Sequence, residues 1–112
     1  MARGSRAYDA SMSPTEPRTV CALNADVVGY SRLLADDAAG TSVAMSEARA
    51  IVETAIGDHG GTLVNFVGDN FMAVFDKAID AVRAAISITT ALEDVNSDRP
   101  SARHLRFRMG IE

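Results

Sequence analysis

The 112-residue chain has the size of one domain and carries eleven Lys and Arg against fifteen Asp and Glu, a formal net charge of −4. This balance offers no basic surface to nucleic acid or to an anionic membrane, and no apolar run approaches the roughly 18 residues of a membrane span. The single cysteine, Cys21, cannot form an internal disulfide, so a cytoplasmic location is expected.

Residues 1–17 are rich in Ser, Pro, Arg and Gly and show no hydrophobic periodicity, which predicts a disordered N-terminal lead. This lead carries positive charge without an apolar core, so it is not a secretory signal. Residues 18–112 then form the folded domain. A buried central strand is predicted over residues 19–28, interrupted only by Asn24 and Asp26.

A helical segment is predicted over residues 29–37 and a longer helix over residues 41–58, ended by a C-terminal cap at Gly60 and Gly61. The longer helix has an apolar stripe at helical spacing, formed by Ala44, Ala48, Ile51, Val52, Ala55 and Ile56. Residues 60–75 predict a β-hairpin with Gly68, Asp69 and Asn70 at its tip.

A second helix is predicted over residues 76–96, with Asp76 as its N-cap. Its apolar stripe consists of Ala78, Ala81, Val82, Ala85, Ile88, Leu92 and Val95. A polar loop over residues 96–103 contains the helix breaker Pro100. The last strand alternates, with Leu105, Phe107, Met109 and Ile111 on the buried face and Arg106, Arg108 and Glu112 on the solvent face.

This order of elements predicts an α+β fold, a ferredoxin-like βα(α)ββαβ antiparallel sheet with helices on one face. In that topology the first and third strands lie side by side at the centre and run antiparallel. Asp26 ends the first strand and Asp69 immediately precedes the third. The two carboxylates are therefore expected to converge on one edge of the sheet.

The hairpin is apolar on both sides, which predicts self-association because two helices cover only one face of a single sheet. One side is expected to hold Leu63, Val67, Phe71 and Phe75, and the other Val64, Phe66, Met72 and Val74.

Two ionised carboxylates close together repel each other, so a divalent cation between Asp26 and Asp69 would stabilise both. Oxygen ligation with open positions for water and phosphate suits Mg²⁺ or Mn²⁺. It does not suit zinc, because Cys21, His59 and His104 are not suitably spaced. The simpler interpretation is that Asp26 is a surface acid at a strand end and that Asp69 only closes the hairpin turn.

Next to Asp26 the chain turns into a helix start through Val27, Val28, Gly29, Tyr30 and Ser31. Backbone N–H groups at such a start, with a glycine that permits close approach, form a cradle for phosphate. Neighbouring metal and phosphate sites suggest a nucleoside triphosphate as ligand.

Several separated motifs resemble the first half of a class III adenylate/guanylate cyclase catalytic domain, from Arg18 to the end of the chain. They are Asn24-Ala-Asp26-Val-Val-Gly-Tyr30-Ser31, His59-Gly60-Gly61, Val67-Gly68-Asp69, Asp80-Ala-Val-Arg83 and Phe107-Arg108-Met109-Gly110-Ile111.

This resemblance implies that Asp26 and Asp69 are catalytic and bind two Mg²⁺ or Mn²⁺ ions, with Val27 beside them at the metal site. One ion would activate the ribose 3′-hydroxyl to attack the α-phosphorus, and the other would hold the β and γ phosphates as pyrophosphate leaves. The product would be a 3′,5′-cyclic nucleotide used in signal transduction, with ATP favoured over GTP as substrate.

The resemblance also implies that the backbone of Val27, Val28, Gly29 and Tyr30 cradles the phosphates and that Asn65 and Gly68 belong to the substrate site. It implies a head-to-tail dimer with two-fold symmetry, either a homodimer or a heterodimer with a complete cyclase domain. The active sites would then lie at the subunit interface.

The chain departs from the family pattern at two positions. Asn65 stands where the family usually has a purine-selecting Lys, and Asn70 stands where it commonly has Gly. The family's second half supplies another base-reading residue and an Asn and an Arg that stabilise the transition state, and none has a counterpart in these 112 residues. The chain alone is therefore expected to make little cyclic nucleotide.

An alternative function is a non-catalytic module that binds metal and nucleotide, or dimerises, and so regulates an intact cyclase. A diguanylate cyclase ranks lower, since that class expects a Gly-Gly-Asp/Glu-Glu-Phe turn. The corresponding segment here is Val67-Gly68-Asp69-Asn70-Phe71.

Overall fold

The computed structural model describes residues 20–112, and residues 1–19, which include the predicted N-terminal lead, lie outside it. The elements in chain order are β1 (Cys21–Val27), α1 (Tyr30–Asp36), α2 (Ala38–Asp58), β2 (Thr62–Val67), β3 (Asn70–Phe75), α3 (Ala78–Asn96), a short 3-10 helix η2 (Ser101–Arg103), and β4 (Phe107–Ile111). This order confirms the predicted fold class.

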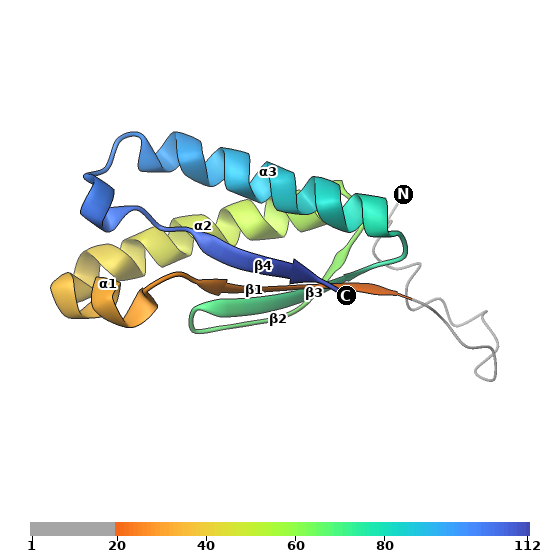
Figure 1. Ribbon diagram of the computed structural model, residues 1–112, viewed down its shortest axis with the longest axis horizontal. Coiled ribbons are helices and arrows are strands. Elements are labelled where there is room, and N and C mark those ends of the chain that lie inside the picture. Colours follow the sequence, from red (N-terminus) through yellow and green to blue (C-terminus); the bar gives the residue numbers. More distant parts are fainter. Residues whose placement is uncertain (1–19) are drawn as a thin grey trace.

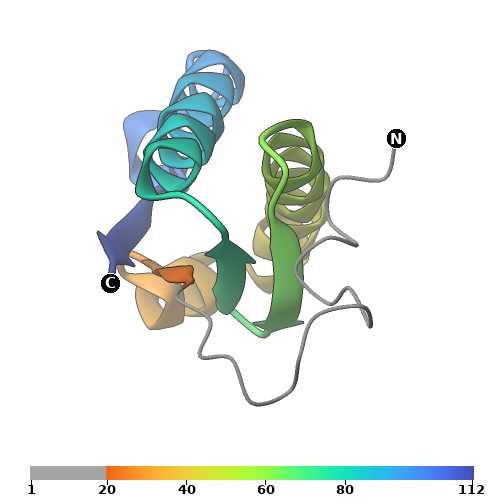
Figure 2. The same cartoon turned by 90° about the vertical axis from the view of Figure 1, so that its right-hand side faces the viewer.

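The four strands form one antiparallel sheet in the order β2-β3-β1-β4. β1 and β3 therefore occupy its centre, as the ferredoxin-like topology predicts. α2 and α3 lie side by side against one face of the sheet (Figures 1 and 2). Within residues 20–112, no helix covers the opposite face, and none is long and apolar enough to span a membrane.

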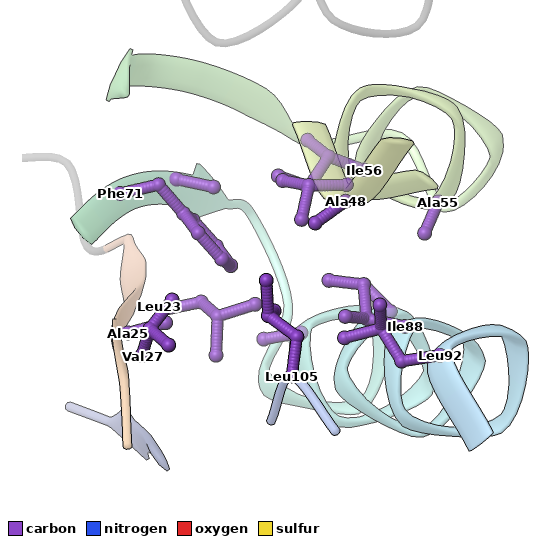
Figure 3. Close-up of a cluster of buried hydrophobic side chains, with 14 of the residues drawn as sticks. Leu23, Ala25, Val27, Ala48, Ala55, Ile56, Phe71, Ile88, Leu92 and Leu105 are labelled. Carbon is purple, nitrogen blue, oxygen red and sulfur yellow. The ribbon is translucent and has the colours of Figure 1, made fainter. Parts of the chain in front are cut away.

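The core lies between the sheet and the two long helices (Figure 3). Alternate residues of β1, Leu23, Ala25 and Val27, are buried against the helices. The helices contribute Ala44, Ala48, Val52, Ala55, Ile56, Ala81, Ala84, Ile88 and Leu92. Because successive strand side chains point to opposite faces, Asn24 and Asp26 lie on the open face of the sheet.

The start of α3 differs from the prediction. The helix begins at Ala78, and its N-cap is Lys77, in extended backbone and without a side-chain cap, rather than Asp76. Its buried stripe runs through Ala81, Ala84 and Ile88, whereas Val82 is 40% exposed. Small residues face the sheet here because alanines allow the helix backbone to approach it closely.

The hairpin also differs from the simple alternation that the sequence predicts. A β-bulge shifts the β2–β3 register between Leu63 and Asn65. The extra residue turns Phe66 to the helix side of the sheet, where its ring stacks on Phe71 with centroids 5.5 Å apart. The prediction that Phe66 shares a face with Met72 is therefore wrong, and so is the prediction that Val67 shares a face with Phe71. Val67 pairs with Asn70 on the open face and is 67% exposed, so this face exchanges a phenylalanine for a valine.

A buried asparagine positions β4. Asn96, 1% exposed at the end of α3, donates its side-chain N–H to the Leu105 carbonyl at 2.9 Å. Its side-chain oxygen accepts the Leu105 N–H at 3.0 Å. These two hydrogen bonds satisfy the backbone N–H and carbonyl of Leu105, which is fully buried, and they anchor the chain shortly before β4 begins.

The end of α2 confirms the predicted glycine cap. Gly60 has a φ of 74°, and the Gly61 N–H donates to the Ile56 carbonyl at 2.9 Å. A Cβ on Gly61 would lie 2.3 Å from Cε2 of Phe75, a ring that is 1% exposed. Gly61 therefore lets the chain pass directly against the core.

We predict that Gly61→Ala lowers the free energy of unfolding by about 1–3 kcal/mol, because the new methyl group overpacks the Phe75 site. Urea denaturation measures this change. Gly57→Ala is the matched control, because nothing lies within 4 Å of a Cβ at that exposed helical position. The control should raise stability by up to about 1 kcal/mol. Equal effects of the two substitutions would show that Phe75 does not restrict position 61.

Candidate functional site at the edge of the sheet

The site begins where β1 meets β3. Asp26 pairs across the strands with Asn70 in β3 and with Arg108 in β4. The Val27 N–H donates to the Asp69 carbonyl at 3.1 Å. The backbone segments that carry Asp26 and Asp69 are thus hydrogen-bonded neighbours, where the antiparallel pairing of the central strands was expected to bring them. Figure 1 shows α1 and the tip of the β2–β3 hairpin at this same end of the sheet.

The Asp26 carboxylate forms a bidentate ion pair with Arg108. Nε of Arg108 donates to Oδ1 at 3.1 Å, and Nη2 donates to Oδ2 at 2.9 Å. The hydrogen bonding of Arg108 to Asp26 and the negative charge of Asp26 raise the pKa of the Arg108 guanidinium above its ordinary value. The Asp26 side chain is 39% exposed and that of Arg108 is 75% exposed, so solvent and ligands reach the pair.

A shallow hollow of about 530 Å³ lies on the open face around this pair. Its polar lining includes Asn24, Asp26, Asn65, Asn70 and Arg108, and Met72 contributes an apolar centre. Met72 pairs with Asn24 on one side and with Asn65 on the other, so the two amides flank it across three adjacent strands. Asp69 does not line the hollow; it directly precedes Asn70, which does.

The turn from β1 into α1 is built on Gly29, the N-cap of α1, which has a φ of 64° in the left-handed region that favours glycine. The Val27 and Val28 N–H groups donate to the carbonyls of Asp69 and Arg106. These two amides are therefore committed to the fold and not free for a phosphate. Of the backbone groups predicted to bind phosphate, those of Gly29 and of the first turn of α1 remain. Helix geometry leaves the N–H groups of a first turn without intrahelical partners.

Aromatic packing supports the site from the helix side. The Phe107 ring meets Phe71 edge-on with centroids 5.2 Å apart, and it meets Phe66 at 6.3 Å. The Arg49 guanidinium lies 5.3 Å from the centroid of Phe66. One aromatic residue from each of β2, β3 and β4 thus holds these strands together beneath the hollow.

The donor set decides which metal could bind. Among residues 20–112, no group of three or more His, Cys, Asp and Glu side chains is placed to hold a metal ion. Mg²⁺ and Mn²⁺ keep several waters and commonly bind through one or two carboxylates together with substrate phosphates. Asp26 and Asp69 fit that pattern, provided that Arg108 releases Asp26. The residues therefore suit an ion shared with a phosphate ligand.

A more enclosed cavity of about 400 Å³ lies between α1, the start of α2 and the η2 loop. Its charged side chains form ion pairs, Arg103 with Asp37, Arg99 with Glu47 and Asp36 with Arg32, although Nη1 of Arg99 is buried without a hydrogen-bond partner. The Asp37 carboxylate also accepts the Gly40 N–H at the start of α2. The first two pairs connect the loop to α2, so the open-face hollow is the better candidate for chemistry.

Comparison with known proteins identifies the relatives of this arrangement. The chain is 33% identical over 95 residues to "Putative adenylate cyclase 3" of Rhizobium meliloti (strain 1021), a match that covers 84% of this chain. An adenylate/guanylate cyclase/hydrolase from Silicibacter pomeroyi is 34% identical over 86% of this chain, and its crystal structure superposes with a TM-score of 0.68. The chain is therefore related to the catalytic domains of class III adenylate and guanylate cyclases.

The match covers only part of these relatives. This class III cyclase-type chain spans 16% of the Rhizobium protein and 56% of the Silicibacter chain. The adenylyl cyclase CyaB from P. aeruginosa shares the fold at 21% identity, with a TM-score of 0.71 over 82% of this chain. No protein-family model matches the sequence.

The structure of the cyclase-type domain adds residues that the sequence analysis missed. Arg108 was assigned to the solvent side of its strand, and it does lie there, but that side is the open face that also carries Asp26. Asn24 and Asn70 likewise line the hollow. The expected position of β4 beside β1 indicated that some residue of β4 lies next to Asp26. It did not indicate which one, because the register that sets Arg108 opposite Asp26 depends on the loop before β4. The roles of Asp26, Asp69, Asn65 and Gly68 in binding stay predictions.

Proposed function

We propose that this domain binds a nucleoside triphosphate with Mg²⁺ or Mn²⁺ at the open-face hollow and provides the metal-binding part of a nucleotide cyclase. The observation that carries the proposal is the β1–β3 pairing, which makes the segments of Asp26 and Asp69 hydrogen-bonded neighbours beside that hollow. The proposed reaction converts ATP, or GTP, into a 3′,5′-cyclic nucleotide and pyrophosphate.

Residues in the hollow and beside it have distinct roles in this proposal. Asp26 and Asp69 supply the carboxylate oxygens that the metal ions require. When bound, two such ions increase the acidity of the ribose 3′-hydroxyl and offset the charge on the departing pyrophosphate. Arg108, once released from Asp26, presents a planar guanidinium on the same face, and its geometry matches phosphate oxygens. Gly29 and the first turn of α1 approach the phosphates with backbone N–H groups.

The base would lie over Met72, between the amides of Asn24 and Asn65. An amide offers both a donor and an acceptor but no charge, so it reads a base edge less strongly than a lysine reads an acceptor. ATP is the proposed substrate because the Rhizobium relative is named an adenylate cyclase.

A second cyclase-type domain is the proposed partner of the open face. No described helix covers this face in residues 20–112, and the hollow is wide open to solvent. Water must be excluded for charge stabilisation to reach its full strength in a phosphoryl-transfer site. A homodimer, or a heterodimer with a complete cyclase domain, would close the hollow and complete the site.

We predict that Asp26→Asn and Asp69→Asn each abolish binding of Mn²⁺·ATP, because either change removes a charged oxygen ligand from the shared metal site. Isothermal titration calorimetry on the 112-residue chain measures the affinity. Asp58→Asn is the matched control, since Asp58 is an exposed carboxylate at the far end of α2. Unchanged Mn²⁺·ATP affinity in Asp69→Asn would overturn the proposed metal site.

We predict that the 112-residue chain alone forms little or no cyclic nucleotide from ATP or GTP with Mn²⁺. Loss of a transition-state arginine typically lowers turnover by a factor of about 10³ or more, and Asn65 lacks the charge of the family's lysine. Adding a chain that carries the second half of a cyclase domain should restore turnover, whereas Asn65→Lys alone should not.

The same assay separates catalysis from the non-catalytic alternative, which Asn65 favours. Mn²⁺·ATP binding without turnover, even after complementation, would identify the domain as a nucleotide-binding regulatory module. Several turnovers per minute by the isolated chain, with Asp26→Ala inactive, would contradict the expected need for a second domain.

A further inference from the structure

We propose that Arg108 is a positioning residue that makes metal binding depend on triphosphate binding. Arg108 stays paired with the Asp26 carboxylate until a phosphate group binds the Arg108 guanidinium. This inference rests on the proposed function and adds that the metal ion and the triphosphate bind cooperatively. The free domain would bind the divalent ion weakly, and metal and triphosphate would bind together.

The backbone already places the two residues for this role. Asp26 and Arg108 are direct cross-strand partners of β1 and β4 on the open face of the sheet. Both carboxylate oxygens accept a hydrogen bond from the guanidinium, at 3.1 and 2.9 Å. A metal ion that approaches Asp26 therefore meets oxygens that are already engaged by a cation.

The local charges explain why metal alone binds poorly. A divalent ion that displaces Arg108 would leave the guanidinium unpaired next to a new positive charge, and like charges at short range repel. In the part of the chain that the structure describes, Asp26 is the carboxylate that Arg108 contacts. Without another ligand, the free energy of metal binding must include the loss of this pair.

A triphosphate removes that obstacle. Its oxygens are acceptors for the forked N–H groups of Arg108, which lines the same hollow as Asp26. Arg108 can then exchange one anionic partner for another while Asp26 becomes free for the metal. By thermodynamic linkage, the factor by which the triphosphate raises metal affinity equals the factor by which the metal raises triphosphate affinity.

The neighbouring arginine provides a matched control. Arg106 has the same charge two residues earlier, but its Nε donates to Glu93 at 3.2 Å and its Nη2 contacts His104 at 3.3 Å. It contacts neither Asp26 nor the hollow. Arg106→Gln therefore changes the net charge as Arg108→Gln does and leaves the Asp26 pair intact.

The test measures Mn²⁺ binding to the 112-residue chain without nucleotide, by electron paramagnetic resonance of free Mn²⁺, in the wild type and in Arg108→Gln, Arg108→Lys and Arg106→Gln. Arg108→Gln should bind Mn²⁺ about threefold more tightly than the wild type, a factor typical of losing one exposed ion pair. Arg108→Lys keeps the charge but loses the bidentate guanidinium geometry, so its Mn²⁺ affinity should lie between those of the wild type and Arg108→Gln. Arg106→Gln should match the wild type.

Calorimetry with Mn²⁺·ATP completes the comparison. Arg108→Gln should bind Mn²⁺·ATP no more tightly than the wild type, so the advantage that ATP gives to metal binding should shrink. A second readout is the Nε–H resonance of Arg108 in a ¹⁵N-labelled chain. It should shift when Mg²⁺ and ATP are added together and stay in place with Mg²⁺ alone.

Two results would overturn this inference. One is an equal gain of Mn²⁺ affinity in Arg108→Gln and Arg106→Gln, which would show a general effect of charge. The other is unchanged Mn²⁺ affinity in both Arg108 variants, with circular dichroism spectra that match the wild type. Neither result affects the proposed function, which fails separately if Asp26→Asn keeps its Mn²⁺·ATP affinity.

Discussion

The antiparallel pairing of β1 and β3 is the constraint on which the fold and the site both depend. It places Leu23 and Ala25 against the helices and, by alternation, Asn24 and Asp26 on the open face. The same pairing joins Val27 to Asp69 through a backbone hydrogen bond. A one-residue slip between these strands would turn Asp26 into the core and bury an ionised carboxylate, so the apolar core itself holds the site in register.

The features predictable from the sequence were those set by local pattern and by topology. Helical periodicity located the buried faces of α2 and much of α3, and the order of elements was enough to bring the segments of Asp26 and Asp69 together. The bulge that turns Phe66 toward the helices was not predictable, because β2 carries no glycine or proline to mark it. The Asp26–Arg108 pair depends on the register of β4, which in turn depends on the buried side chain of Asn96.

The two faces of the sheet differ in what covers them. One side of the sheet is sealed by α2 and α3, and aromatic rings from β2, β3 and β4 fix the strands beneath the hollow. On the other side, acid, guanidinium and amides face solvent without a covering layer in the described residues. In the proposed function, these groups would bind a ligand through charge, and a second surface that excludes water would strengthen their effect on the reaction. The chain's similarity to part of longer cyclases is consistent with that division of roles.

The most direct test of the central claim is paramagnetic broadening of amide signals in a ¹⁵N-labelled chain, with Mn²⁺ and a non-hydrolysable ATP analogue. The β1–β3 site predicts that broadening is strongest at three places: the end of β1 with the turn after it, the hairpin tip around Asp69, and Arg108 in β4. Strongest broadening around Asp58 or Asp80 would contradict the account, because these residues lie at the ends of α2 and α3 that are far from α1 and the hairpin tip.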